Sequence, residues 1–236
     1  MPRAQPLLLL PPSEGKAPGG DGPSWPALGT ADRALDRHRR VVQRAAKAAG
    51  ATPKRAGTMP AIERYTGVLY KELDWPSMPA GARRRGAEQV RIVSGLWGLV
   101  APGDPLPPYR LKMSARLPEL GRLSTWWRPR LAPVVAALAH DRVVWDLLPI
   151  EHTAAMDWPA IEPAMRITVR FVDRDDKTVS HWNKLLKGAL VRWVLAEEPS
   201  GPDDLGDFEH PLGYRYDRDA TQLGDGSAAV VLRASS

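Results

Sequence analysis

Residues 93–113, VSGLWGLVAPGDPLPPYRLKM, join the end of a hydrophobic strand to a loop that is rich in glycine and proline. The glycines permit backbone angles that other residues resist, and the four prolines fix φ and exclude a helix. Such a loop holds one shape without a hydrogen-bonded ladder, so it presents Tyr109, Arg110 and Lys112 at its end. We interpret it as part of a binding site. A rigid connection between two core elements is the alternative.

Short runs rich in Val, Ile and Leu, typical of buried strands, recur on both sides of this loop. The predicted strands are residues 7–10, 89–93, 143–148, 167–172 and 228–232. The predicted helices are residues 31–49, 59–73, 131–140 and 179–197. This alternation predicts an α/β (mixed α+β) fold, with a mixed sheet flanked by helices. We expect a single domain over residues 1–236, although two small domains are possible at this length.

The composition permits some classes of function and excludes others. The 33 Lys and Arg exceed the 27 acidic residues, and the net charge of +6 permits attraction to phosphate polymers or anionic ligands. The absence of cysteine excludes disulfides, a thiolate nucleophile and iron–sulfur clusters. The five histidines show no metal-ligand spacing, so we expect no metal site and no cofactor.

The first apolar run, residues 7–10, is shorter than the roughly 7–15 residues of a secretory signal core. No stretch approaches the roughly 18 apolar residues that a membrane span needs. We therefore expect a cytoplasmic protein without a membrane partner.

The turn Pro12-Ser13-Glu14-Gly15-Lys16 follows the first strand. Ligands of α/β sheets usually bind at the carboxyl ends of strands, and phosphate suits backbone N–H groups beside a lysine ammonium. The turn is not a Walker A loop, because the spaced upstream glycine and the Ser/Thr after the lysine are missing. A plain turn with a solvent-exposed lysine is the alternative.

Two further basic groups are candidates. Arg110, with its planar fork, can hold a phosphate or carboxylate bidentately beside Tyr109, unless it only ties the proline-rich loop to the core. In the helix after residue 180, helical periodicity places Lys184, Lys187 and Arg192 opposite the apolar face, with Gly188 among them. This stripe predicts close approach of a polyanion; a solvated helix face is the alternative.

Polar groups of mixed chemistry favour a second hypothesis, an enzyme that acts on a nucleotide or nucleobase in a strand-end cleft. Carboxylates repel DNA, so a site that only binds phosphates would not need them. The catalytic candidates are Glu14, Tyr70, Asp104 and Glu151. Glu151 and His152 form the only adjacent acid–histidine pair in the chain.

The block at residues 94–113 resembles the YaaA family of bacterial peroxide stress proteins. Four more pieces of the family pattern occur in the expected order: residues 12–16 (PSEGK), 64–70 (RYTGVLY), Trp126-Trp127 with 148–151 (LPIE), and 183–188 (NKLLKG). Where the family commonly has an aromatic residue after the acid, this chain has His152. Its basic helix carries Lys187-Gly188 in place of Arg-Gly.

The resemblance implies a cantaloupe-like fold around a positively charged cleft, with a helix-hairpin-helix-like element near residues 179–210. It also implies a cytosolic protein that limits peroxide damage, is associated with lower free intracellular iron and binds double-stranded DNA. Ser13 and Tyr109 would line the cleft. Sequence-independent contacts to phosphates would come from six residues: Lys16, Arg110, Lys112, Lys184, Lys187 and Arg192.

Overall fold

The computed structural model describes residues 5–23, 30–50, 57–179 and 182–235. Its centre is a seven-stranded sheet in the order β10-β11-β9-β8-β1-β3-β4. The strands are β1 (Leu7–Leu10), β3 (Val90–Ser94), β4 (Gly98–Val100), β8 (Val143–Asp146), β9 (Met165–Val172), β10 (Tyr214–Gly224) and β11 (Ser227–Ala234). The sheet is mixed. The edge strand β4 pairs antiparallel with β3, the edge strand β10 pairs antiparallel with β11, and all other neighbours pair parallel. The predicted α/β class and the single domain are therefore confirmed.

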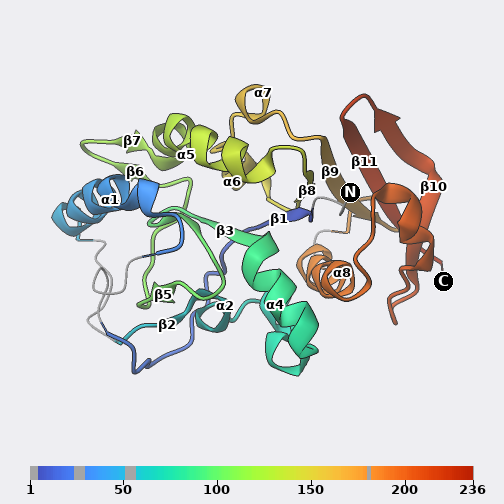
Figure 1. Cartoon of the computed structure of the whole chain (residues 1–236), viewed down its shortest axis with the longest axis horizontal. Coiled ribbons are helices and arrows are strands. Elements are labelled where there is room, and N and C mark those ends of the chain that lie inside the picture. The colour runs from blue at the N-terminus through green and yellow to red at the C-terminus, as the bar shows by residue number, and fades with distance from the viewer. Residues whose placement is uncertain (1–4, 24–29, 51–56, 180–181, 236) are drawn as a thin grey trace.

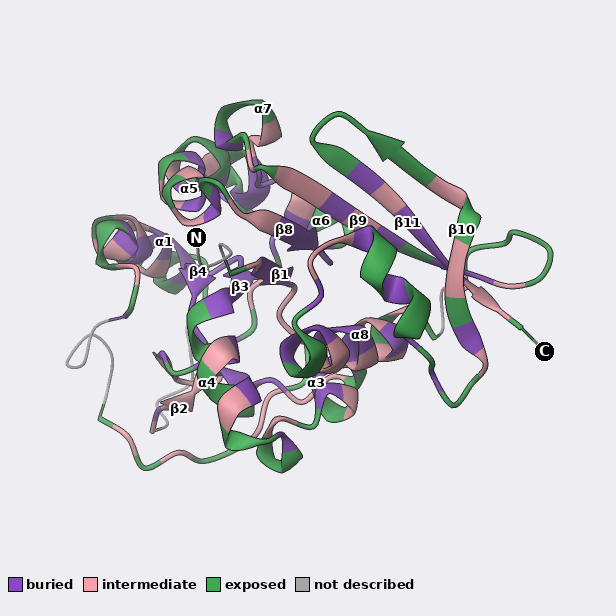
Figure 2. Ribbon diagram, turned by 45° about the vertical axis from the view of Figure 1, so that its right-hand side comes forward, coloured by how far each residue is buried: buried purple, intermediate pink, exposed green. Residues whose placement is uncertain are grey.

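Strand β1 explains why the sheet lies inside the molecule. Its four leucines are all fully buried, since layers of side chains cover both faces of this parallel part. Leu8 pairs with Val90 of β3 on one side and with Trp145 of β8 on the other. Figure 2 shows that burial is concentrated in these central strands, whereas β10 at the edge is largely exposed.

Helices cover both faces of the sheet (Figure 1). They are α1 (Asp36–Ala48), α2 (Ala61–Arg64), α3 (Val68–Leu73), α4 (Ala80–Gln89), α5 (Leu123–Ala139), α6 (Ile150–Thr153), α7 (Trp158–Ile161) and α8 (Asn183–Glu197). The 3₁₀ helices are η1 (Arg33–Leu35), η2 (Trp75–Ser77) and η3 (Pro202–Asp207). Two small ribbons, β2 (Met59–Pro60) with β5 (Pro105–Leu106) and β6 (Arg116–Leu117) with β7 (Gly121–Arg122), lie outside the main sheet. None of the described helices is long and apolar enough to cross a membrane.

Three predicted helices begin at other residues than expected: α1, α5 and α8, the last of which begins at Asn183 rather than at residue 179. Helix α1 begins at Asp36 rather than at residue 31, after the 3₁₀ helix η1. Helix α5 begins at Leu123 rather than at residue 131, and it contains both Pro129 and Pro133. Strand β10 and helix α4 were not predicted, since neither has a continuous apolar run.

The predicted helix over residues 59–73 is interrupted, and this break positions the candidate site. Between α2 and α3, Tyr65 is extended (ψ 125°) and Gly67 is extended as well (ψ 166°). Tyr65 forms an antiparallel bridge with Lys16. The chain therefore leaves the helical conformation in order to pair with the loop after β1.

Candidate functional site

Two loops and a short helix line a cavity of about 680 Å³ beyond the carboxyl ends of β1 and β8. Residues 12–16 follow β1, residues 109–115 end the proline-rich loop, and residues 151–152 lie in α6 after β8. Seven predicted residues line this cavity: Ser13, Glu14, Lys16, Tyr109, Arg110, Lys112 and Glu151. The strand-end location thus follows the rule for ligand sites in α/β sheets.

The loop after β1 is held by the segment between α2 and α3. The backbone N–H of Ala17 donates to the Arg64 carbonyl at 2.9 Å, and that of Thr66 donates to the Gly15 carbonyl at 3.2 Å. The Ser13 hydroxyl also accepts from the N–H of Thr66 at 3.1 Å. A Cβ on Gly67 would lie 2.6 Å from the Cβ of Ser13, so only glycine permits this approach.

Arg64 is the main anchor of this part of the site, and its side chain is fully buried. Its guanidinium donates to the carbonyls of Leu106 (2.9 Å), Gly19 (2.9 Å) and Gly57 (2.9 Å), and also to that of Ala17. One side chain therefore joins the loop after β1 to β5 and to the segment before β2. Arg64 is the first residue of the motif at 64–70, and local sequence gives no indication of this anchoring role.

Tyr109 is positioned by a hydrogen-bonded chain of hydroxyl groups. Its phenol oxygen lies 2.6 Å from the Tyr65 hydroxyl and 2.6 Å from the Ser94 hydroxyl. Burial raises the pKa of Tyr109 to about 12, so the phenol remains protonated. A Cβ on Gly95 would lie 2.8 Å from the Lys112 carbonyl, which explains the glycine where the two ends of the loop meet. Ser94, Tyr65 and Gly95 are positioning residues that the sequence did not single out for this role.

Lys16 places a partly buried amine in the cavity. Its Nζ donates to the Ser13 carbonyl at 2.8 Å and lies 4.3 Å from the centre of the Tyr109 ring. Burial lowers the pKa of Lys16 from 10.5 to about 8, and the charges of Arg110 and Arg64 act in the same direction against the raising effect of Glu14.

Carboxylates stand beside these cations. Glu14 forms an ion pair with Lys112 at 2.6 Å, and both side chains are exposed. The hydrogen bond and the charge of Lys112 lower the pKa of Glu14, with smaller contributions from Lys184 and Lys16. Lys184, which is exposed at the start of α8, therefore acts on the field at the cavity mouth. An exposed pair of this kind adds little stability, so its charges remain available to a ligand.

His152 contributes a buried imidazole to the cavity wall. Its side chain is 6% exposed, and its Nδ1 lies 3.5 Å from a Glu151 oxygen without hydrogen-bond geometry. Burial lowers the pKa of His152 to about 4, against the raising effect of Glu151. The ring is therefore neutral near pH 7 and leaves one buried nitrogen for a ligand or water to meet.

The burial of His152 predicts that the folded protein loses stability in acid. The unfolded chain binds a proton on His152 below pH 6.5 and the folded chain only below about 4, so stability falls as the pH drops through this window, by up to about 3 kcal/mol. We expect His152→Phe to lose less stability than the wild type between pH 7 and pH 4.5, measured by urea unfolding. Equal losses of stability in the two proteins would contradict the lowered pKa of His152.

Two predicted catalytic residues do not line the cavity. The hydroxyl of Tyr70 donates to the Pro11 carbonyl at 2.7 Å, and burial raises its pKa well above 10. The carboxylate of Asp104 accepts from the N–H groups of Ala31 (2.8 Å) and Ala101 (2.9 Å), and burial raises its pKa. Both side chains form hydrogen bonds with backbone groups, which corrects their predicted place in the strand-end cleft.

Helix α8 does not present the predicted exposed stripe. Lys187 is largely buried and donates to the Leu147 carbonyl at 2.9 Å, where β8 ends. Arg192 donates to the carbonyls of Leu73 and Asp74, both at 3.0 Å. Gly188 is buried against α3 rather than open to a polyanion.

Helix α8 is followed by the 3₁₀ helix η3, and residues 180–181, which belong to the helix predicted over 179–197, lie outside the described part of the chain. The predicted role of the region near 179–210 in DNA binding stays a prediction.

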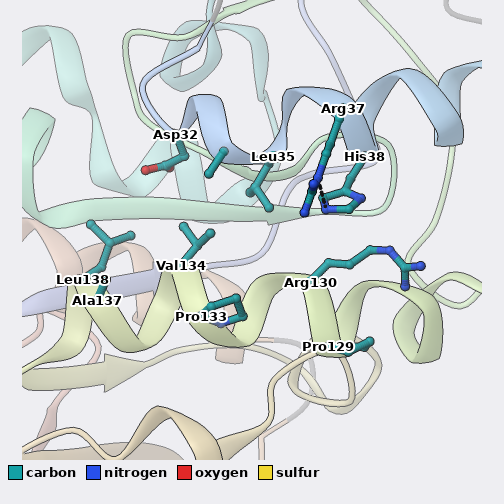
Figure 3. A pocket seen from close by; sticks show the side chains of 11 residues that line it. Asp32, Leu35, Arg37, His38, Pro129, Arg130, Pro133, Val134, Ala137 and Leu138 are labelled. Atoms are coloured by element: carbon teal, nitrogen blue, oxygen red, sulfur yellow. Dashed lines mark hydrogen bonds between the residues drawn. The ribbon is translucent and has the colours of Figure 1, made fainter.

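A groove of similar volume, about 700 Å³, lies between α1 and α5 (Figure 3). Its floor is mostly apolar, with Val134 and Leu138 from α5 opposite Leu35. Arg130 stacks on the Trp126 ring at 3.9 Å rather than pointing to a shared centre with carboxylates. No cluster of three metal-ligating side chains occurs in the described residues. The polar groups that could do chemistry together are those of the strand-end cavity.

Fold and site together define a mixed α/β protein with a polar, partly basic cavity at the end of its central strand. Sequence comparison then gives its family. The model of the family described as "Peroxide stress protein YaaA" matches residues 29–220. The chain therefore belongs to the YaaA peroxide stress protein family, as the resemblance predicted.

Curated relatives agree with this assignment. A UPF0246 protein of Streptomyces coelicolor is 38% identical over 245 aligned positions, which cover 92% of this chain and 94% of the relative. A UPF0246 protein of Corynebacterium glutamicum is 32% identical, with 81% and 86% covered. One of Cereibacter sphaeroides is 34% identical, with 76% and 71% covered.

Proposed function

We propose that this chain acts in the response to peroxide by binding a small phosphate-bearing ligand of nucleotide type in the strand-end cavity. One observation carries the proposal: Lys16 and Arg110 line the same cavity as Glu14, Glu151 and the neutral His152. The cations suit a phosphate, and the carboxylates and imidazole suit hydroxyl or base groups. A volume of about 680 Å³ lies within the range of small-molecule sites.

The distribution of charge favours a compact ligand over a long polyanion at this site. Lys187 and Arg192 are engaged with main-chain carbonyls. A surface that tracks a DNA backbone needs a row of cations directed to solvent. A ligand that enters the cavity needs only the convergent Lys16 and Arg110.

The test is calorimetric titration of the protein with adenosine monophosphate and with inorganic phosphate. We expect Arg110→Ala to weaken binding of both by roughly tenfold or more, because a charge-assisted contact is lost. Arg84→Ala, which removes an exposed arginine of α4, is the matched control and should bind like the wild type. Equal affinity in the Arg110 variant and the wild type would remove the cavity from the proposal. Peroxide survival and free iron in cells that carry each variant link binding to the family role.

Binding of double-stranded DNA is the second candidate, favoured by the exposed Arg110, Lys112 and Lys184 around the cavity mouth. Fluorescence anisotropy with a labelled duplex across salt concentrations tests it, since phosphate contacts give a steep decrease of affinity with salt. Lys112→Ala combined with Lys184→Ala should weaken binding and flatten the salt slope. An unchanged slope would exclude these lysines from the interface.

A further inference from the structure

We propose that the ε-amine of Lys16 forms an imine with the aldehyde of a phosphorylated sugar bound in the strand-end cavity. This inference rests on the proposed function, because it names the chemistry of the ligand that the cavity would take. The aldehyde can belong to a free sugar phosphate or to an abasic position in DNA, which share the same reacting group.

The surroundings of Lys16 favour a reactive amine over a salt-bridged one. In the described part of the chain Lys16 has no ion pair, and the Glu14 carboxylate pairs with Lys112 instead. The ammonium is held by the Ser13 carbonyl and lies over the ring of Tyr109. With a pKa of about 8, roughly one amine in ten is unprotonated at pH 7, far more than for an ordinary lysine.

The position of the amine is fixed as well as its charge. The backbone of Lys16 is bridged to Tyr65, and the ring beneath its side chain is held by Ser94 and Tyr65. A nucleophile that is held in place before the ligand arrives loses little entropy on reaction. A solvent-exposed lysine in a plain turn would have none of these supports.

The other cavity groups suit the rest of a sugar phosphate. Arg110 lines the same cavity and its charge acts on Lys16, which places a cation for the phosphate near the amine. The buried Nδ1 of His152 lacks a hydrogen-bond partner, and a sugar hydroxyl would supply one. Glu151 at the cavity wall can pass a proton to and from the reacting atoms.

The step balances without an oxidant or reductant. The lone pair of the neutral amine attacks the aldehyde carbon, and the carbonyl oxygen takes up a proton to give a carbinolamine. Loss of the hydroxyl as water and of the remaining N–H proton then gives the imine. The amine and the aldehyde are converted to one imine and one water.

Sodium cyanoborohydride, which reduces an imine to a stable secondary amine, tests the proposal on the intact protein. The probes are ribose 5-phosphate, ribose, and a duplex with one abasic site, and peptide mass spectrometry locates the label. At pH 7 we expect ribose 5-phosphate to label Lys16 roughly tenfold more than the exposed Lys71 of α3. Labelling should rise with pH around a midpoint near 8, and ribose without phosphate should react more slowly.

Lys16→Arg should abolish the site-specific label, and Lys71→Arg should keep it. Preferential labelling by the duplex instead of the free sugar phosphate would identify DNA as the source of the aldehyde. If Lys16 is labelled no more than Lys71 while phosphate binding persists, the imine is wrong and the proposed function stands. If the label and phosphate binding are both absent, both proposals fail.

Discussion

Replacing Arg64 by alanine is expected to lower the free energy of unfolding by about 3–5 kcal/mol, because four carbonyl groups lose their donor at once. These carbonyls belong to three segments: the loop after β1, which supplies Ala17 and Gly19, the segment before β2, and β5. Urea unfolding at pH 7 measures the change.

Arg84→Ala is the matched control, since it removes an exposed arginine of the same charge. We expect its stability to stay within about 0.5 kcal/mol of the wild type. The Arg64 variant should also lose phosphate binding under conditions where it remains folded, because the loop that carries Lys16 is released. A loss of stability below about 1 kcal/mol would contradict the anchoring role.

Gly188→Ala is expected to destabilise the protein by about 2–3 kcal/mol, although helix propensity favours alanine over glycine. Alanine in place of a helical glycine alone would add up to about 1 kcal/mol of stability. The added Cβ would lie 2.2 Å from the Leu69 carbonyl oxygen and 2.9 Å from the Cβ of Glu72, so α3 and α8 would have to move apart. Thermal unfolding of the two proteins measures the difference.

The control for this change is Gly206→Ala in the 3₁₀ helix η3, where a Cβ would meet no atom within 4 Å. We expect little change in its stability. A Gly188 variant that is as stable as the wild type would mean that α3 and α8 do not pack as described. The prediction also separates two roles of Gly188, because a glycine needed only for a polyanion would tolerate alanine without loss of stability.

Part of the candidate site could be predicted from the sequence and its resemblance. The turn at residues 12–16 was expected at the carboxyl end of a buried strand, and the resemblance implied that Ser13 and Tyr109 line one cleft; both residues line the same cavity. Tyr70 and Asp104 were placed wrongly for a common reason. Their polar groups bond to nearby backbone atoms, and neither the Pro11 carbonyl nor the N–H of Ala31 could be identified as a partner from sequence.

By itself the sequence determined the class of fold, the central strands and the family. Four consecutive leucines in β1 can be stable only where both faces of a strand are covered, so local composition was sufficient there. Only the tertiary structure decided which cations face the cavity. Helical periodicity predicts that Lys187 and Gly188 share a face, and it carries no information on the element that packs there. Burial and hydrogen bonding depend on contacts between distant segments, and α3 and β8 cover this face.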